Sequence, residues 1–284
     1  MQKIVKLVLF TIVLGVISLF LAVIISFIFS QVIPGDRVLP YIPEGPVDPE
    51  VYQHMYHLLG LDRSFIEQFF IYLNKMLMLD WGRSISRNLA YDLITERILP
   101  TLFLLLLPLI LGLVLGFVLS NYSMNFEARK GERLVQLLSI LGFSIPILLM
   151  TVLFSLFLSF INTIFLLVLI WISLTISIMA LTILLVRMYL NKLSKEVSEK
   201  RLNILFITFI GVGCGIIFIL LILTEIMFSF GGLGELLLQA LNSADYYVIN
   251  GIIFIMLFSF PIFIILTLFS FFLFGRFKAV FLAR

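Results

Sequence analysis

Two histidines, His54 and His57, are the only imidazole side chains in the sequence, and imidazole is a common metal ligand. They stand three residues apart in a stretch that we expect to be helical, so both lie on one face, with Asp48 and Glu50 nearby. Two imidazoles at this spacing can share a metal ion such as nickel. Histidines on an exposed amphipathic helix are more often plain surface residues, so we assign no metal ligand.

Two further reactive side chains lie in apolar surroundings. Cys214 is the single cysteine, so an intramolecular disulfide or a cysteine cluster for a metal is excluded. Glu225 stands near the end of an apolar run, and a carboxylate in lipid costs about 2.5–3.5 kcal/mol. We therefore expect Glu225 to face a cavity, a partner subunit or lipid headgroups.

The composition sets the class of protein. Of the 284 residues, 62% are hydrophobic and 12% are charged, whereas soluble domains contain about 45–50% apolar residues. Several apolar runs exceed the roughly 20 residues that a helix needs to cross a bilayer. No alternating ten-residue pattern of a lipid-facing barrel is present. The sequence predicts an all-α integral membrane protein.

Six transmembrane helices are predicted, at 7–30, 101–120, 134–160, 163–186, 203–225 and 248–275. The first lacks a small-residue cleavage site, which favours a retained span over a signal peptide. Lys and Arg outnumber Asp and Glu in the N-terminus, in 121–133, in 187–203 and in the C-terminal tail, whereas acidic residues prevail in 31–100 and 225–247. Both termini are therefore predicted to be cytoplasmic, and because topology explains the basic residues, no nucleic-acid partner is expected.

The long segment 31–100 carries helix signals of its own. Asp48 followed by Pro49 predicts a helix start, and Gly60 its end. Ser64 and Glu67 have the spacing of a capping box, which opens a helix with an apolar stripe that we expect to lie along the membrane or on a partner subunit. A third helix, 89–99, is predicted to end at Pro100 and to lead into the second span as an elbow.

Seven short stretches occur in an order that resembles one transporter family. They are VIPGD at 32–36, LGLDR at 59–63, WGRS at 81–84, ERILPTL at 96–102, GFSIP at 142–146, the run from 225 to GGLG at 231–234, and DY at 245–246. The chain resembles the permeases of dipeptide, oligopeptide and nickel ABC importers, specifically the first of the two paired permease subunits. The resemblance covers nearly the whole chain, with a first helix at 1–30, an extracytoplasmic helical segment at 31–100 and a five-helix core at 101–284.

This resemblance implies a type I importer permease without catalytic residues or a cofactor of its own. Its expected partners are a second homologous permease, two cytoplasmic ATPase subunits that hold ATP and Mg, an extracytoplasmic solute-binding lipoprotein and membrane lipids. Transport would proceed by alternating access. The implied substrate is a di- or oligopeptide, and a nickel or metallophore complex is the alternative.

Two groups of residues are assigned from the resemblance and from their positions. The outer gate and translocation path are expected to include Ser144, Pro146, Glu225, Phe230, Gly231 and Gly234. The solute-binding protein is expected to dock on Arg83, Arg87, Glu96 and Arg97, although a solvated surface would have the same composition.

The charged island 187–201 is predicted to face the ATPase. Family members carry a longer segment here, with an Ala pair and a glycine, and both are missing from this chain. The candidate coupling residues that remain are Lys192, Ser194, Lys195, Glu196 and Glu199. Three hypotheses about this segment therefore stay open. A shortened coupling helix could still engage an ATPase, coupling could pass mainly through the partner permease, or the chain could have a non-transporting scaffold or receptor role. An ion-coupled carrier is disfavoured because no span shows paired ionisable residues or repeated broken helices.

Overall fold

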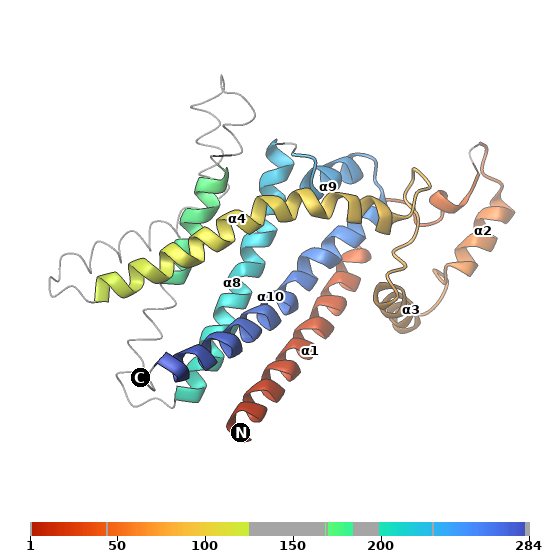
Figure 1. The fold of residues 1–284 in the computed structure, drawn as a ribbon. Helices are drawn as coiled ribbons and strands as arrows, with labels where there is room; N and C mark the ends of the chain where they lie inside the picture. Colours follow the sequence, from red (N-terminus) through yellow and green to blue (C-terminus); the bar gives the residue numbers. More distant parts are fainter. Residues whose placement is uncertain are drawn as a thin grey trace. The chain divides into compact units, whose positions relative to one another are not determined.

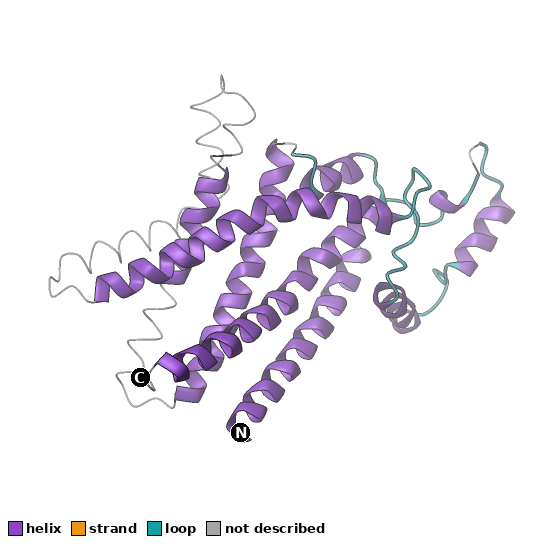
Figure 2. Ribbon diagram, in the orientation of Figure 1, coloured by secondary structure: helices purple, strands orange, loops and turns teal. Residues whose placement is uncertain are grey.

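The structure of the chain, a computed structural model, describes residues 2–43, 45–124, 168, 170–183, 199–228 and 230–281. It divides into two compact units. Unit 1 comprises Met1–Ser18, Leu102–Thr224 and Ser259–Arg284, and unit 2 comprises Leu19–Thr101 and Glu225–Phe258. Throughout the described ranges the regular elements are helices, as Figure 2 shows, apart from one isolated bridge between Arg83 and Leu89. The prediction of an all-α chain is confirmed for these residues.

Long apolar helices account for most of the described chain: α1 (Gln2–Ser30), α4 (Ala90–Met124), α8 (Glu199–Phe228) and α10 (Tyr246–Phe281), labelled in Figure 1. Two segments within them, Ala90–Leu119 and Tyr246–Thr267, are long and apolar enough to cross a membrane. The predicted helices at 7–30, 101–120, 203–225 and 248–275 are present. Residues 134–160 lie outside the described part, and only 168 and 170–183 of the predicted span 163–186 are described, as helix.

One sequence prediction about these helices is wrong. A separate helix at 89–99 that ends at Pro100 was expected, yet α4 runs without interruption from Ala90 to Met124. Proline lacks a backbone N–H and so removes one intrahelical hydrogen bond, but it does not force a helix to end when packing holds both sides. Arg97 and Thr101, on either side of Pro100, are both held by tertiary hydrogen bonds.

Unit 2 contains short helices whose ends are set by capping residues and glycine. Asp48 accepts a hydrogen bond from the Glu50 N–H as the N-cap of α2 (Pro49–Leu58), which is followed by Gly60 with a φ of +72°. The predicted capping box between Ser64 and Glu67 opens α3 (Phe65–Leu77). The 3-10 helix η1 (Leu39–Tyr41) and α9 (Leu233–Asn242) belong to the same unit.

Small residues set the helix packing within unit 1. Gly112 and Gly116 of α4 form a G-x-x-x-G pattern, and a Cβ at either position would overlap Ile178 or Thr182 in the helical segment 170–183. Glycine at both positions lets the two backbones approach closely, which is how helices without a hydrophobic driving force gain van der Waals contact in a membrane. This contact joins α4 to 170–183.

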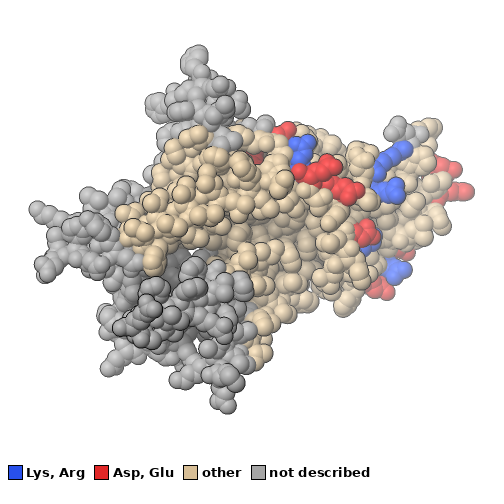
Figure 3. All heavy atoms as spheres, in the orientation of Figure 1, with Lys and Arg blue, Asp and Glu red and all other residues tan. Residues whose placement is uncertain are grey.

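The surfaces of the long helices are mostly apolar. Large hydrophobic side chains are exposed along α1 and α4, among them Val16, Ile28, Phe103, Ile110 and Val114. On the face drawn in Figure 3, the charged side chains of the described residues gather over segments of unit 2. The exposed apolar surface fits a lipid environment.

Candidate functional site

The Glu225 carboxylate, at the last turn of α8, is almost fully buried in unit 2, with 1% of the side chain exposed. Its Oε2 accepts hydrogen bonds from the Thr101 hydroxyl at 3.0 Å and from the Gly234 N–H at 2.9 Å. Its Oε1 has no hydrogen-bond partner within the described residues. Glu225 therefore faces the start of α9, whose unpaired N–H groups and dipole favour a negative charge.

Thr101 joins α4 to the same site. The Thr101 hydroxyl donates to Glu225 and accepts from the Leu233 N–H at 2.9 Å. Residue Gly232, the N-cap of α9, has no side chain that could cap the helix. Thr101 and Glu225, from two other helices, satisfy the first N–H groups of α9 instead, so these three elements are held together by buried hydrogen bonds.

The glycine loop before α9 is held on both sides. Arg97 Nη1 donates to the Gly231 carbonyl at 3.0 Å, and the Gly231 N–H donates to Glu235 Oε2 at 2.7 Å. A Cβ at position 232 would overlap the Glu225 carboxylate. Glycine is therefore required at 232 by the close approach of the carboxylate. We call Thr101, Glu225, Gly232, Leu233 and Gly234 the α9 junction.

A second buried carboxylate organises the start of α10. The Asp245 side chain accepts hydrogen bonds from the Ser84 hydroxyl, from the Ile85 N–H at 3.1 Å and from the Val248 N–H at 3.4 Å. It thus caps α10 and anchors the loop that precedes α4. Only 5% of the Asp245 side chain is exposed.

Two motif glycines pack against the same short region. Gly35 has a φ of +123°, and a Cβ there would overlap the Ala244 carbonyl oxygen. Gly82 has a φ of +86°, and a Cβ there would overlap the Tyr247 ring. Both positions combine a left-handed backbone with a close approach, so only glycine fits without strain.

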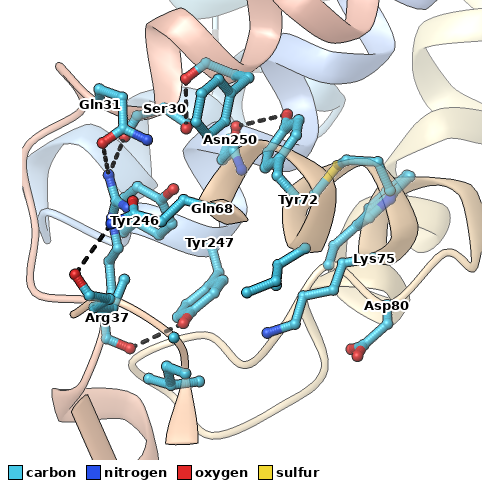
Figure 4. A pocket seen from close by; sticks show the side chains of 17 residues that line it. Ser30, Gln31, Arg37, Gln68, Tyr72, Lys75, Asp80, Tyr246, Tyr247 and Asn250 are labelled. Carbon is cyan, nitrogen blue, oxygen red and sulfur yellow. Dashed lines mark hydrogen bonds between the residues drawn. The ribbon is translucent and has the colours of Figure 1, made fainter. Parts of the chain in front are cut away.

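A small pocket lies in unit 2 between the end of α1, α3 and the start of α10 (Figure 4). Most of its polar side chains are engaged with one another. Arg37 donates to the Ser30 carbonyl at 2.6 Å and lies 4.4 Å from the centre of the Tyr246 ring. Tyr72 bonds to Ser26 and donates to Asn250 Oδ1 at 3.3 Å, and burial raises the pKa of Tyr72, which keeps the phenol protonated. The polar side chains around the pocket thus connect the end of α1 with α3 and the start of α10.

Comparison with known proteins shows similarity over part of the chain. The chain is 29% identical over 136 residues to the "Glutathione transport system permease protein GsiC" of Escherichia coli (strain K12), and equally to that of Shigella flexneri serotype 5b (strain 8401). The chain is a distant relative of transport-system permease proteins. The match covers 47% of this chain and 44% of each relative, so it spans less than half the length of the curated relatives. No protein-family model matches.

For this permease relative, the structure brings part of the predicted gate set together. Glu225 and Gly234 share a hydrogen bond, Gly231 lies in the loop between them, and Phe230 precedes it half-buried. Ser144 and Pro146 lie outside the described residues. The predicted gate set did not include Thr101, Gly232 and Glu235. Thr101 and Gly232 contact Glu225, and Glu235 accepts a hydrogen bond from the Gly231 N–H. No sequence feature near Thr101 indicated that it would contact the gate set, although Thr101 belongs to the ERILPTL stretch.

The predicted docking set is divided between different environments. Arg97 is half-buried and donates to the carbonyl of Gly231, a residue of the predicted gate set. Arg87, with a φ of +67°, donates to the Ile42 carbonyl at 3.1 Å. Arg83 and Glu96 are exposed, and the backbone N–H of Arg83 donates a hydrogen bond to the Tyr41 hydroxyl. Docking on these residues stays a prediction.

The predicted coupling residues fall almost entirely outside the described part of the chain. This applies to Lys192, Ser194, Lys195 and Glu196, whereas Glu199 is the first described residue of α8, in a stretch whose side chains are not described. Coupling to an ATPase therefore stays a prediction.

His57 makes a local contact. Its Nδ1 lies 2.8 Å from Asp62 Oδ2, and this hydrogen bond holds the pKa of Asp62 below its usual range. Among the residues described, no three His, Cys, Asp or Glu side chains gather as a metal site would require. The hydrogen bond joins the end of α2 to the loop before α3.

Proposed function

We propose that this chain is the permease subunit of an ATP-driven ABC importer for di- or oligopeptides. In this proposal it pairs with a second homologous permease, two ATPase subunits and a solute-binding lipoprotein. The permease named in the comparison, a protein of a glutathione transport system, supports this class because glutathione is a small peptide.

One observation carries the proposal: residues from four of the seven motif stretches form hydrogen-bonded pairs in unit 2, and a fifth stretch packs beside one of these pairs. Arg97 and Thr101 of ERILPTL hydrogen-bond to the GGLG run, Ser84 of WGRS bonds to Asp245, and Gly35 of VIPGD packs on Ala244 beside it. Motifs that matched by chance would have no reason to converge. The convergence supports a preserved architecture of the importer permeases.

The α9 junction gives the proposed transporter a rigid unit near the path. Breaking the bonds of a buried carboxylate to a helix N-terminus and a threonine would leave buried groups unpaired, which costs about 1–3 kcal/mol for each group, so the satisfied network rigidifies this region. We infer that unit 2 moves as one body during alternating access and that the glycine loop at 231–232 lines the gate.

The deciding test is ATP hydrolysis by the complex purified from its native host and reconstituted in liposomes, with and without binding protein loaded with dipeptide. Loaded binding protein is expected to stimulate hydrolysis and to drive uptake of radiolabelled dipeptide. Replacement of 192–200 by a Gly/Ser linker should abolish the stimulation, and Gly/Ser replacement of the exposed residues 45–47 is the control for a change in a surface loop. Unchanged stimulation would exclude direct coupling through this segment.

A second candidate, a non-transporting scaffold, is favoured by one observation. The segment between the fourth and fifth predicted spans is short and lacks the Ala pair and glycine of family members. A complex that binds loaded binding protein but never moves peptide or a nickel complex would establish this role and refute the importer.

A further inference from the structure

Helix α3 has three faces where an ordinary amphipathic helix has two. Phe69, Tyr72 and Met76 lie on a face that packs on the protein. Glu67 and Asn74 lie on a polar face, with Gln68 and Lys75 farther round. Between these, at helical spacing, stands a set of exposed apolar side chains: Ile66, Phe70 and Leu77, with 68%, 61% and 57% of their surface exposed. The apolar stripe is thus about twice as wide as the part that the protein covers.

The packing face fixes where α3 crosses α1. The ring of Phe27 lies 4.9 Å from that of Phe65, 5.3 Å from that of Phe69 and 5.4 Å from that of Tyr72, centroid to centroid. Positions 65 to 72 span about 10 Å along a helix axis, yet all three rings meet one residue of α1. The two helices therefore cross rather than run side by side, and in Figure 1 α3 is seen along its axis next to the end of α1.

The crossing lies at the level of the apolar part of α1. Phe27 stands three residues, about 4–5 Å, before the end of α1 at Ser30, and Phe20, whose ring lies 6.4 Å from that of Phe69, stands about 15 Å before it. Half of the hydrocarbon core of a bilayer is about 15 Å. If α1 crosses the membrane, α3 lies at a depth where water is scarce.

The same level of α1 also carries exposed apolar side chains. Ile25, Ile28 and Phe29 on the last two turns of α1 are also exposed, and they belong to the same unit. A soluble partner would have to displace lipid from α1 to reach α3 at this depth. Lys75 at the end of α3 is half-buried, on a long side chain that can extend its charge toward headgroups.

We infer that α3 is an in-plane membrane helix, with Ile66, Phe70 and Leu77 in contact with lipid acyl chains at the boundary with the headgroups. This rests on the proposed function only in that α1 crosses the membrane. The polar side chains Glu67 and Asn74 lie on the stripe that adjoins the exposed apolar set, and the capping box pairs the Ser64 and Glu67 N–H groups at the start of α3.

Site-directed fluorescence tests this placement in the complete chain, purified with its co-purifying subunits and reconstituted in phosphatidylcholine vesicles. In a Cys214→Ala background, Ile66→Cys and Asn74→Cys are labelled with the same small fluorophore; both native side chains are exposed, and eight residues of helix place them about 80° apart around the axis of α3. Ile28→Cys on α1 reports whether α1 itself lies in lipid. Quenching is measured with lipids brominated near the glycerol end and, separately, with aqueous iodide.

The expected result is that the Ile66→Cys label is quenched several-fold more by brominated lipid than by iodide, and the Asn74→Cys label the reverse. If Ile66→Cys is quenched mainly by iodide while Ile28→Cys is quenched by lipid, α3 is an aqueous helix and the inference is wrong. An Ile66→Cys label shielded from both quenchers means that a protein partner covers this face, which also overturns it. Iodide quenching of Ile28→Cys would reject the membrane placement of α1 and the transporter proposal together.

Discussion

The Thr101 hydroxyl donates a hydrogen bond of 3.0 Å to the Glu225 carboxylate, although 124 residues separate them in sequence. The same hydroxyl accepts from the Leu233 N–H at 2.9 Å. One small side chain thus connects α4, the end of α8 and the start of α9. The arrangement predicts that Thr101 matters more for the stability of unit 2 than its size would indicate.

Replacement of Thr101 by valine should destabilise the protein. Valine keeps the shape but leaves the Leu233 N–H without an acceptor and Glu225 Oε2 without one donor, and a buried group left unpaired costs about 1–3 kcal/mol. Thr95→Val, on the same helix, is the control, because the Thr95 hydroxyl bonds only to the Asp92 carbonyl of its own helix. The apparent melting temperature in detergent, followed by size-exclusion chromatography, measures both. Equal effects would refute the proposed bridging role.

Replacement of Gly82 by alanine should lower the same melting temperature. The new Cβ would overlap the Tyr247 ring in addition to the strain of a positive φ, and overpacking of this kind costs about 1–3 kcal/mol. Gly45→Ala separates the two causes, because Gly45 also has a positive φ but its Cβ would meet nothing. In a Tyr247→Leu background, Gly82→Ala should lower the melting temperature by less than it does in the parent protein. If Gly45→Ala were as harmful as Gly82→Ala, backbone strain alone would explain both.

Replacement of Gly116 by valine should disturb unit 1. The side chain would overlap Thr182 and the Met179 carbonyl and force α4 away from the segment 170–183. Leu115→Val, at an exposed neighbouring position, is expected to leave the melting temperature unchanged. Equal melting temperatures of Gly116→Val and Leu115→Val would show that this contact does not depend on Gly116.

The Asp62–His57 contact predicts a pH dependence of the turn between α2 and α3. The hydrogen bond from His57 lowers the pKa of Asp62 in the folded state, so its stabilising effect is present above the unfolded pKa and is lost as pH falls through the folded pKa. With an ordinary Asp value of about 3.9, the loss occurs below about pH 4.

Carboxyl chemical shifts of labelled aspartate in the complete chain measure this effect. His57→Ala should raise the Asp62 pKa toward its ordinary value, whereas His54→Ala, on the same helix and also exposed, should not. An unchanged Asp62 titration in His57→Ala would show that the neighbouring charge of Arg63 or the backbone causes the shift instead.

Local features of this protein were predictable from the sequence. The cap at Asp48 and the capping box at Ser64 depend on residues within one helical turn, and the apolar runs predict helices by their length. The expected break at Pro100 was wrong because the sequence does not show tertiary contacts. Proline removes one hydrogen bond within the helix, but Arg97 and Thr101, on either side of it, both take part in tertiary hydrogen bonds.

The candidate site shows what a pattern of residue types leaves out. Glu225 was expected to face a cavity, a partner subunit or lipid headgroups, and the sequence named no partner for it within the chain. Thr101, Gly232 and Glu235 became recognisable only when α4, α8 and α9 were brought together. Likewise, Arg97 was assigned to the docking set, and the structure adds a contact with the carbonyl of Gly231, a residue of the predicted gate set.

The sequence by itself determined the class of the protein, the helices and their caps, because composition and contacts within a few residues decide those features. The tertiary structure decided which distant groups pair: Thr101 with Glu225, Ser84 with Asp245, and α3 across α1 at Phe27. The physical reason is burial. A carboxylate or an unpaired N–H removed from water must find a partner wherever the chain brings one, and that position depends on how whole helices pack.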